Sequence, residues 1–190
     1  MMNDPKDLIK KIQAGDTISF RSLIEQYQRL VSHIVFRLVR SPKDREDICQ
    51  DVFLQVYQNL GTFKFESKLS TWIARIAYNR CLNYLEKKRI PLYHDVLSAE
   101  TSVETLAEHG VQPDQEVESR DLSDVLQHEI EQLPIQSRTI ITLYHLEQMK
   151  YQEIAEVMQM PEGTVKSYLF RARKLLKQRL SEKYRIEELI

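Results

Sequence analysis

The segment that most constrains the fold of this chain is residues 150–179, KYQEIAEVMQMPEGTVKSYLFRARKLLKQR, a pattern typical of two short helices joined by a tight corner. Pro161 suits the first turn of the second helix, because N–H groups in that turn have no helical partner. Gly163 lies in the same corner. Apolar residues recur at i, i+4, i+7 and i+11 on the second helix, which defines one buried stripe. The apolar residues are Ile154, Ala155, Val157 and Met158 on the first helix and Val165, Leu169, Ala172 and Leu176 on the second. The segment therefore predicts a helix-turn-helix.

The opposite face of the second helix is expected to be strongly basic. Between Gly163 and Arg185 the chain has eight Lys or Arg residues and one acidic residue, Glu182. A helix that is buried on one side and cationic on the other matches the major groove of DNA in size and charge. The alternative is a solvated basic helix, since a run of charges alone does not define a binding surface.

Composition predicts an all-α protein. The 190 residues include only four glycines and six prolines, whereas helix formers such as Leu, Glu, Gln, Lys and Arg are abundant. Cys49 and Cys81 lack the spacing of metal ligands, and two isolated cysteines are typical of a reducing compartment. The chain shows no signal-peptide pattern and no apolar run near 18 residues, so we expect a cytoplasmic protein.

Charge is segregated along the chain, although the net charge is only −1. Residues 1–89 contain 16 basic and 10 acidic side chains, whereas residues 90–121 contain one basic and eight acidic side chains. The acidic segment also lacks a sustained hydrophobic period and contains helix-breaking residues, as linkers do. We therefore expect two small helical domains, residues 1–90 and 122–190, joined by a flexible acidic linker at 91–121.

Hydrophobic periodicity and proline positions indicate the helix boundaries. Ser41-Pro42 is expected to end one helix and begin the next, because the residue before a proline disfavours the helical region. Leu133-Pro134 separates two helices of the second domain in the same way. The helices expected ahead of the helix-turn-helix are 19–39, 42–59, 70–89 and 136–147, with a short surface helix at 103–108 as the alternative to an irregular linker.

Two strings of this sequence resemble regions of bacterial RNA polymerase sigma factors. DREDICQDVFLQVYQNLGTFKFESKLSTWIARIAYNRCLNYLEKKR is similar to their second region, and LPIQSRTIITLYHLEQMKYQEIAEVMQMPEGTVKSYLFRARKLLKQRL is similar to their fourth. No third region stands between them, and the chain is short, as in the extracytoplasmic-function (ECF) group. The resemblance implies a transcription initiation factor that binds core RNA polymerase. Its first domain would recognise the minus-ten promoter element and help to melt the DNA, and its second would recognise the minus-thirty-five element.

A polar face on the helix at 42–59 is the expected polymerase contact. Asp47, Gln50 and Asp51 fall at i, i+3 and i+4, opposite the apolar side of this helix. The resemblance implies that they dock on a coiled coil of the largest polymerase subunit, and such a face suits a basic helical partner. The alternative is a solvated face.

The resemblance also implies that the acidic linker threads through the polymerase, where its carboxylates would imitate a nucleic-acid backbone. The other explanation for these carboxylates is solubility alone.

The loop at 61–69, GTFKFESKL, and the helix after it are implied to recognise the minus-ten element. Melting requires stacking partners for an unstacked base, and an aromatic ring contributes about 1–3 kcal/mol per base. The implied contacts are Phe63, Lys64, Phe65, Ser67, Arg75, Asn79 and Asn83. Arg80 and Lys87 are further candidates on that helix, although these residues cannot all share one face. Trp72 is expected to belong to the core, since apolar residues surround it in the sequence.

The basic helix at the end of the chain is implied to recognise the minus-thirty-five element. The implied contacts are Lys166, Ser167, Phe170, Arg171, Arg173 and Lys174. Arg171 is the expected bidentate base contact, which would contribute about 1–3 kcal/mol of discrimination between bases. Arg173, Lys174 and Lys177 would chiefly neutralise phosphates.

No catalytic pattern is present in the sequence, so we expect no enzyme activity, metal or cofactor. The five histidines are scattered, and four glycines do not form a phosphate-binding loop.

Two other functions remain open. One is a helix-turn-helix repressor or activator, which would bind palindromic DNA by itself. The other is a helical adaptor that binds only proteins, which leaves the basic helix unexplained. The sigma-factor interpretation implies core RNA polymerase, promoter DNA and an anti-sigma factor, which is membrane-anchored in many relatives, as partners, and no small-molecule substrate.

Overall fold

The computed structural model describes residues 5–87 and 122–183, and every regular element within them is helical, which confirms the predicted all-α fold. The expected linker at 91–121, with its alternative helix, lies outside the described residues. The helices are α1 (Pro5–Gln13), α2 (Thr17–Leu38), α3 (Pro42–Asn59), η1 (Leu60–Thr62), α4 (Leu69–Lys87), α5 (Leu122–Glu131), α6 (Ile135–Ile141), η3 (Thr142–Leu146), α7 (Tyr151–Met158) and α8 (Glu162–Lys183). None of them contains an apolar stretch long enough to cross a lipid bilayer.

Helix α2 is the centre of a first group of helices, α1 to α4. The carboxylate of Asp16 caps its start by accepting hydrogen bonds from the N–H groups of Ile18 (2.9 Å) and Ser19 (3.3 Å). Ser41 and Pro42 begin α3 as predicted. The apolar face predicted for α2 is buried along its length, through Leu23, Leu30, Val31, Ile34, Val35 and Leu38.

Helix α1 is an element that periodicity did not predict. Its nine residues bury Leu8, Ile9 and Ile12 against the core of the first group. A helix this short contains too few apolar repeats to be distinguished from a loop in the sequence. Gly15, with φ 89°, provides the left-handed residue that turns the chain into α2.

Helices α5 to α8 form the second group, and α8 packs on it through the predicted stripe. Val165, Leu169, Ala172 and Leu176 are all buried, which confirms the register of this helix. The corner of the helix-turn-helix differs from the prediction. Gln159 adopts the left-handed conformation that ends α7 (φ 55°, ψ 44°), whereas Gly163 lies inside α8. Glutamine rarely adopts this conformation, so the sequence contains no signal for it.

The helix predicted at 136–147 is instead divided into α6 and a π-helical turn, η3. The hydroxyl of Thr142 donates to the carbonyl of Arg138 (2.9 Å), and the N–H of Glu147 reaches the carbonyl of Thr142 (3.2 Å). A side-chain donor that competes for helical carbonyls favours such widening. The wider turn ends at Leu146, five residues before α7 begins.

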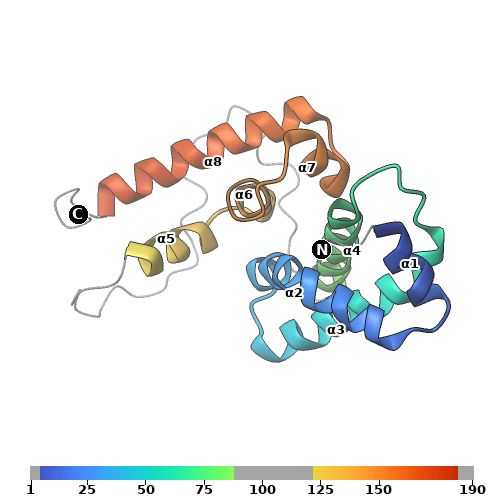
Figure 1. Cartoon of the computed structure of the whole chain (residues 1–190). Helices are drawn as coiled ribbons and strands as arrows, with labels where there is room; N and C mark the ends of the chain where they lie inside the picture. The colour runs from blue at the N-terminus through green and yellow to red at the C-terminus, as the bar shows by residue number, and fades with distance from the viewer. Residues whose placement is uncertain (1–4, 88–121, 184–190) are drawn as a thin grey trace.

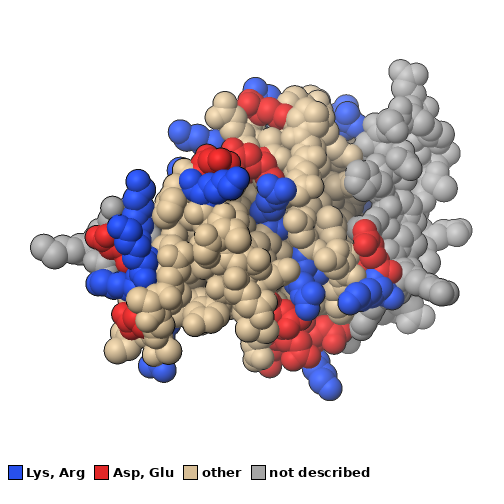
Figure 2. Space-filling model, turned by 90° about the vertical axis from the view of Figure 1, so that its right-hand side faces the viewer, with Lys and Arg blue, Asp and Glu red and all other residues tan. Residues whose placement is uncertain are grey.

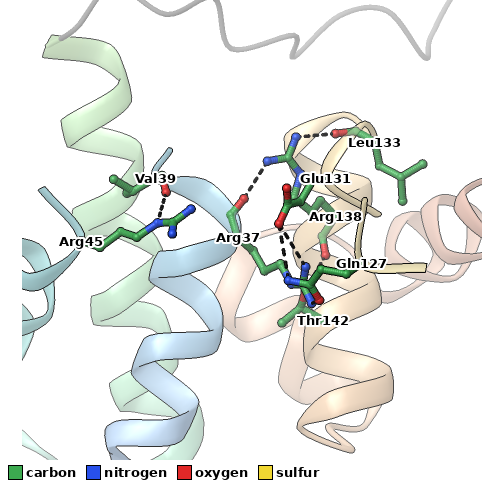
Figure 3. A network of polar contacts seen from close by, with 8 residues as sticks. All are labelled: Arg37, Val39, Arg45, Gln127, Glu131, Leu133, Arg138 and Thr142. Atoms are coloured by element: carbon green, nitrogen blue, oxygen red, sulfur yellow. Dashed lines mark hydrogen bonds and ion pairs between the residues drawn. The ribbon is translucent and has the colours of Figure 1, made fainter. Parts of the chain in front are cut away.

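The two groups of helices are in contact, as Figure 1 shows: α7 packs on α4, and α6 and η3 pack on α2. A polar network joins them at α2 (Figure 3). The guanidinium of Arg138, only 7% exposed, donates to the carbonyls of Arg37 (2.7 Å) in α2 and Leu133 (2.9 Å). Arg37 in turn contacts Gln127 and lies 3.7 Å from Glu131. A cation from the second group therefore caps the C-terminal end of α2.

Adjacent residues of α8 provide a test of its packing. Leu169 is 2% exposed and Phe170 is 70% exposed. We expect Leu169→Ala to lower the free energy of unfolding by about 2–5 kcal/mol, because it removes buried methylene groups and leaves a cavity. Phe170→Ala should change it by less than about 0.5 kcal/mol. Urea denaturation of both variants checks this, and equal losses would contradict the packing of α8.

Candidate protein and nucleic-acid interfaces

The face of α3 that presents the expected polymerase contacts is exposed at Asp47 and Gln50. Asp51 differs from them, because its carboxylate forms an ion pair with Arg80 of α4. Leu54, 54% exposed, lies one turn beyond Gln50 and Asp51 on the same face. We define Asp47, Gln50, Asp51 and Leu54 as the α3 surface. Sequence reasoning missed Leu54, although a large apolar residue on a polar helical face is a detectable signal of a partner.

The loop between η1 and α4 contains an aromatic cluster. The ring of Phe63 lies 4.8 Å from that of Phe65 and 5.4 Å from that of Trp72, between centroids. Phe63 is buried, so in this structure it supports the loop and does not offer a free stacking face. Phe65 is 43% exposed, with φ 59°, and the ammonium of Lys6 lies 5.5 Å from its ring centroid. Phe65 is thus the accessible ring of the pair. Trp72 is half-buried against the core, close to the expectation.

Four-residue spacing places Arg75, Asn79 and Asn83 along one side of α4. Arg75 and Asn83 are exposed and Asn79 is half-buried. Arg80 points instead to α3, where it pairs with Asp51, so its position is explained by packing between helices. Lys64 is exposed and Ser67 is half-buried in the preceding loop. We define the minus-ten surface as the seven expected residues Phe63, Lys64, Phe65, Ser67, Arg75, Asn79 and Asn83, together with Lys68, a further cation expected from the same loop.

Helix α8 exposes every residue that was expected to face DNA. We define these residues as the minus-thirty-five surface: Lys166, Ser167, Phe170, Arg171, Arg173 and Lys174. Ser167 donates to the carbonyl of Gly163 (2.9 Å), and the guanidinium carbon of Arg171 lies 5.9 Å from the ring centroid of Tyr168. The ammonium of Lys166 pairs with Glu162 (2.6 Å), which raises its pKa. The surface therefore combines cations, one hydroxyl and one exposed ring.

Two tyrosines connect this surface to the rest of its group, and sequence reasoning missed both. Tyr144 and Tyr151 stack with their ring centroids 5.2 Å apart and their planes at 15°. The guanidinium of Arg173 lies 5.0 Å from the ring of Tyr144, and the ammonium of Lys166 lies 5.4 Å from that of Tyr151. Two cations of the minus-thirty-five surface, two turns apart on α8, are therefore held by one aromatic stack. The contact between these cations and the tyrosine stack depends on tertiary structure, so no local sequence pattern predicts it.

The polar groups around this stack are linked. Arg173 donates to Nε2 of His145 from Nε (3.2 Å) and Nη2 (3.1 Å). Burial, and then the charge of Arg173, lower the pKa of His145, which favours the neutral ring that accepts these bonds. The hydrogen bond between the two tyrosines, and then one from Arg173, lower the pKa of Tyr144, while the same tyrosine pair raises the pKa of Tyr151.

Two contacts join the minus-ten surface to α7. The ammonium of Lys68 lies 2.7 Å from Oε1 of Glu153. When the Gln159 amide is oriented so that its oxygen and its nitrogen both have suitable partners, the oxygen lies 3.0 Å from Nε and 2.8 Å from Nη2 of Arg75. On the face shown in Figure 2, Lys and Arg form small separate groups, interspersed with Asp and Glu, around a broad uncharged area. The cations of this face are thus not gathered into one continuous patch.

Neither cysteine has the environment of a reactive thiol. Burial raises the pKa of Cys81 to about 12, and burial also raises the pKa of half-buried Cys49. Within residues 5–87 and 122–183, His, Cys, Asp and Glu form no cluster of three or more that could hold a metal ion. The polar surfaces of α3, α4 and α8 are therefore the features that require a functional explanation.

The chain matches two family models, described as Sigma-70 region 2 at residues 23–90 and Sigma-70, region 4 at residues 123–176. The ECF RNA polymerase sigma factor SigW of Bacillus subtilis (strain 168) is 32% identical over 181 residues, which cover 93% of this chain and 97% of that protein. The ECF RNA polymerase sigma-E factor of Escherichia coli (strain K12) is 36% identical over 175 residues, which cover 89% and 90%.

Solved structures share the fold. CnrH in complex with the cytosolic domain of CnrY superposes with a TM-score of 0.65 at 18% identity, over 93% of this chain and 97% of that one. The sigma factor RpoE in complex with the anti-sigma factor NepR from Bartonella quintana superposes with a TM-score of 0.64 at 22% identity, over 87% and 98%. The arrangement of helices is thus similar to that of both proteins.

The tyrosine stack makes a prediction about titration. Tyr151→Phe removes the hydroxyl that is hydrogen-bonded to Tyr144 and lowers its pKa, so the pKa of Tyr144 should rise toward its ordinary value of 10.0. Carbon NMR of labelled tyrosine rings, followed against pH, measures this directly. Tyr57→Phe, on α3, is the matched control and should leave Tyr144 unchanged. An unaltered Tyr144 titration in Tyr151→Phe would show that the pair is not hydrogen-bonded.

Proposed function

This chain belongs to the sigma-70 family, as an ECF RNA polymerase sigma factor that directs promoter recognition, and on this premise we propose which of its surfaces performs each part of that function. The observation that carries the proposal is the presence of three separate polar surfaces on a helical scaffold. The α3 surface would bind core RNA polymerase, and the minus-ten and minus-thirty-five surfaces would bind promoter DNA.

The α3 surface has the chemistry of a protein-docking site. Asp47 and Gln50 offer exposed acceptors, and Leu54 provides apolar area beside them. Such a mixed face complements a basic helical partner that also buries apolar surface. Asp51 would help to position the α3 surface on the polymerase more than it would attract the polymerase by its charge, because the ion pair with Arg80 already neutralises its carboxylate.

The minus-ten surface has the elements needed to hold an unstacked base. Phe65 presents an exposed ring, and Lys64 and Lys68 provide nearby cations for the backbone. Asn79 can both donate and accept a hydrogen bond, as recognition of a base edge requires. Phe63 would act by supporting Phe65 and would not stack on DNA itself.

The minus-thirty-five surface fits the major groove, because α8 is buried on one side and exposes its cations on the other. Arg171 is the proposed base contact. Arg173 and Lys166 would be oriented by the stack of Tyr144 and Tyr151, which limits their rotamers before DNA binds.

The protein would act in the cytoplasm, without catalysis of its own, as an initiation factor of the polymerase. An anti-sigma factor is a further proposed partner: the RpoE relative with this fold is seen bound to the anti-sigma factor NepR. Run-off transcription with purified core RNA polymerase and a genomic promoter library tests the whole proposal. Promoter-dependent transcripts that require the chain are expected. A repressor or activator would instead bind duplex DNA specifically without polymerase.

Two substitutions on α8 separate base recognition from phosphate binding. Arg171→Ala should relax promoter choice, because a bidentate base contact contributes about 1–3 kcal/mol of discrimination. Lys177→Ala should weaken binding evenly and reduce the slope of log affinity against log salt by about one unit. Promoter ranking by sequencing of run-off transcripts measures the first effect, and an unchanged ranking in Arg171→Ala would contradict its assignment.

A charge reversal tests the α3 surface. Asp47→Arg should weaken the affinity for core polymerase by about tenfold or more, because a like charge then faces the basic partner. Glu25→Arg, at an exposed position of α2, makes the same change in net charge and should leave the affinity near that of the unmodified chain. Competition binding against a labelled sigma factor measures both, and equal effects would refute docking through this face.

A further inference from the structure

We propose that α1 contributes a nucleotide-binding site to the promoter interface: a base stacks on the ring of Phe65, and Lys6 of α1 pairs with a backbone phosphate beside that base. The site includes Phe65, so it depends on the minus-ten assignment made above. It gives a function to α1, whose residues precede the range 23–90 that matches Sigma-70 region 2.

Helix α1 packs on η1, which lies just before Phe65 in the chain (Figure 1). Near the end of α1, a Cβ atom added to Gly61 would lie 3.6 Å from Nε2 of Gln13. Near the start of α1, the ammonium of Lys6 lies 5.5 Å from the centroid of the Phe65 ring. The apolar side of α1 is buried in the core of the first group, which fixes the helix against this segment. Lys6 and Phe65 are therefore held side by side although they are far apart in the sequence.

The backbone of Phe65 lies in the left-handed region, with φ 59°, which is unfavourable for a residue that has a Cβ atom. Contacts must therefore hold it there, and one of them is with Phe63, whose ring centroid is 4.8 Å away and whose plane is inclined at 57°. The ring of Phe65 nevertheless remains partly in solvent. A strained residue that keeps an aromatic ring accessible is a signal of function, because packing alone would favour burial of the ring.

An accessible ring with a cation beside it is the combination that single-stranded nucleic acid requires, since the base stacks on the ring and the cation neutralises the backbone. Lys6 is exposed, and its ammonium stands at the end of a flexible stem. Because a cation–π contact at an exposed site is weak, the ammonium can move from the ring to a phosphate oxygen while α1 stays in place. Lys64, exposed and next to Phe65 in the chain, adds a second cation to the site.

A nucleotide fits this site better than an acidic protein partner does. A carboxylate could pair with Lys6, but it would leave the ring of Phe65 without a stacking partner, whereas a nucleotide uses both groups. The site also adjoins the rest of the minus-ten surface. Phe65 contacts Phe63, and the ring of Phe63 lies 5.4 Å from that of Trp72 in the first turn of α4. A DNA strand bound along α4 can therefore continue to Lys6.

Substitutions of Lys6 test the site in the holoenzyme, assembled from the full chain and core RNA polymerase. The probe is a fork-junction DNA with a single-stranded minus-ten element, taken from a promoter that run-off transcription identifies. Lys6→Gln should weaken binding of this DNA by about threefold to tenfold, and reduce the slope of log affinity against log salt by about 0.7, as expected for one phosphate contact on a single strand. Lys6→Arg retains the charge and should restore both values. Lys11→Gln removes the same charge from the other flank of α1 and should resemble the unmodified chain.

Neutral phosphates locate the contact. A methylphosphonate, placed at one position of the single strand at a time, removes one backbone charge. We expect one position at which this change weakens binding by the unmodified holoenzyme and abolishes its advantage over the Lys6→Gln holoenzyme. A merely structural role of Lys6 would give no such position, and that result overturns the proposal.

Two further measurements separate this site from the assignments on which it depends. Phe65→Leu retains an apolar side chain and removes the stacking ring, so it should weaken binding of the same DNA. Equal affinities for Lys6→Gln and Lys11→Gln, with a loss in Phe65→Leu, would refute the Lys6 site and leave the minus-ten assignment supported. Unchanged binding in Phe65→Leu would refute both. Weaker binding of Lys6→Gln to core polymerase alone would show that Lys6 contacts a protein, which also overturns the site.

Discussion

The guanidinium of Arg138 determines how the two groups of helices meet. It originates in α6, donates to a carbonyl at the end of α2 and to Leu133 in its own group, and has almost no contact with water. A buried cation held by fixed acceptors does not permit sliding, because a shift would leave the charge without partners. The apolar packing of α7 on α4 is non-directional by comparison. We infer that this contact, together with the ion pair between Lys68 and Glu153, defines the register in which α7 packs on α4.

Sequence reasoning was accurate where structure is local. The stripe at Val165, Leu169, Ala172 and Leu176 follows from helical periodicity, and the boundary at Pro42 follows from the geometry of proline. Sequence reasoning failed where a residue departs from its usual backbone preference, or where an apolar pattern is too short to identify a helix. The left-handed Gln159, the π-helical turn at 142–146 and the nine-residue α1 are of this kind.

In the candidate surfaces, too, some features could be predicted from the sequence and others could not. Exposure of α8 follows from its periodicity, because the residues opposite a buried stripe must face solvent. The partners of Lys68 and Arg80 could not be predicted, since each pairs with a residue of a different helix. The burial of Phe63 is a further feature that the sequence did not predict. Composition identified two aromatic residues in one loop, but only packing decides that Phe63 is buried and Phe65 is accessible.

The ion pair between Lys68 and Glu153 has a consequence for the ionic strength at which promoters are read. Salt weakens DNA binding because cations return to the phosphates when the protein leaves. Salt also screens the carboxylate of Glu153 that pairs with Lys68, and thereby makes this cation more available to DNA. The two responses oppose each other, so promoter occupancy would vary less with the osmotic state of the cell than the number of phosphate contacts suggests. The carboxylate of Glu153 would thus reduce the sensitivity of DNA binding to changes in the concentration of intracellular ions.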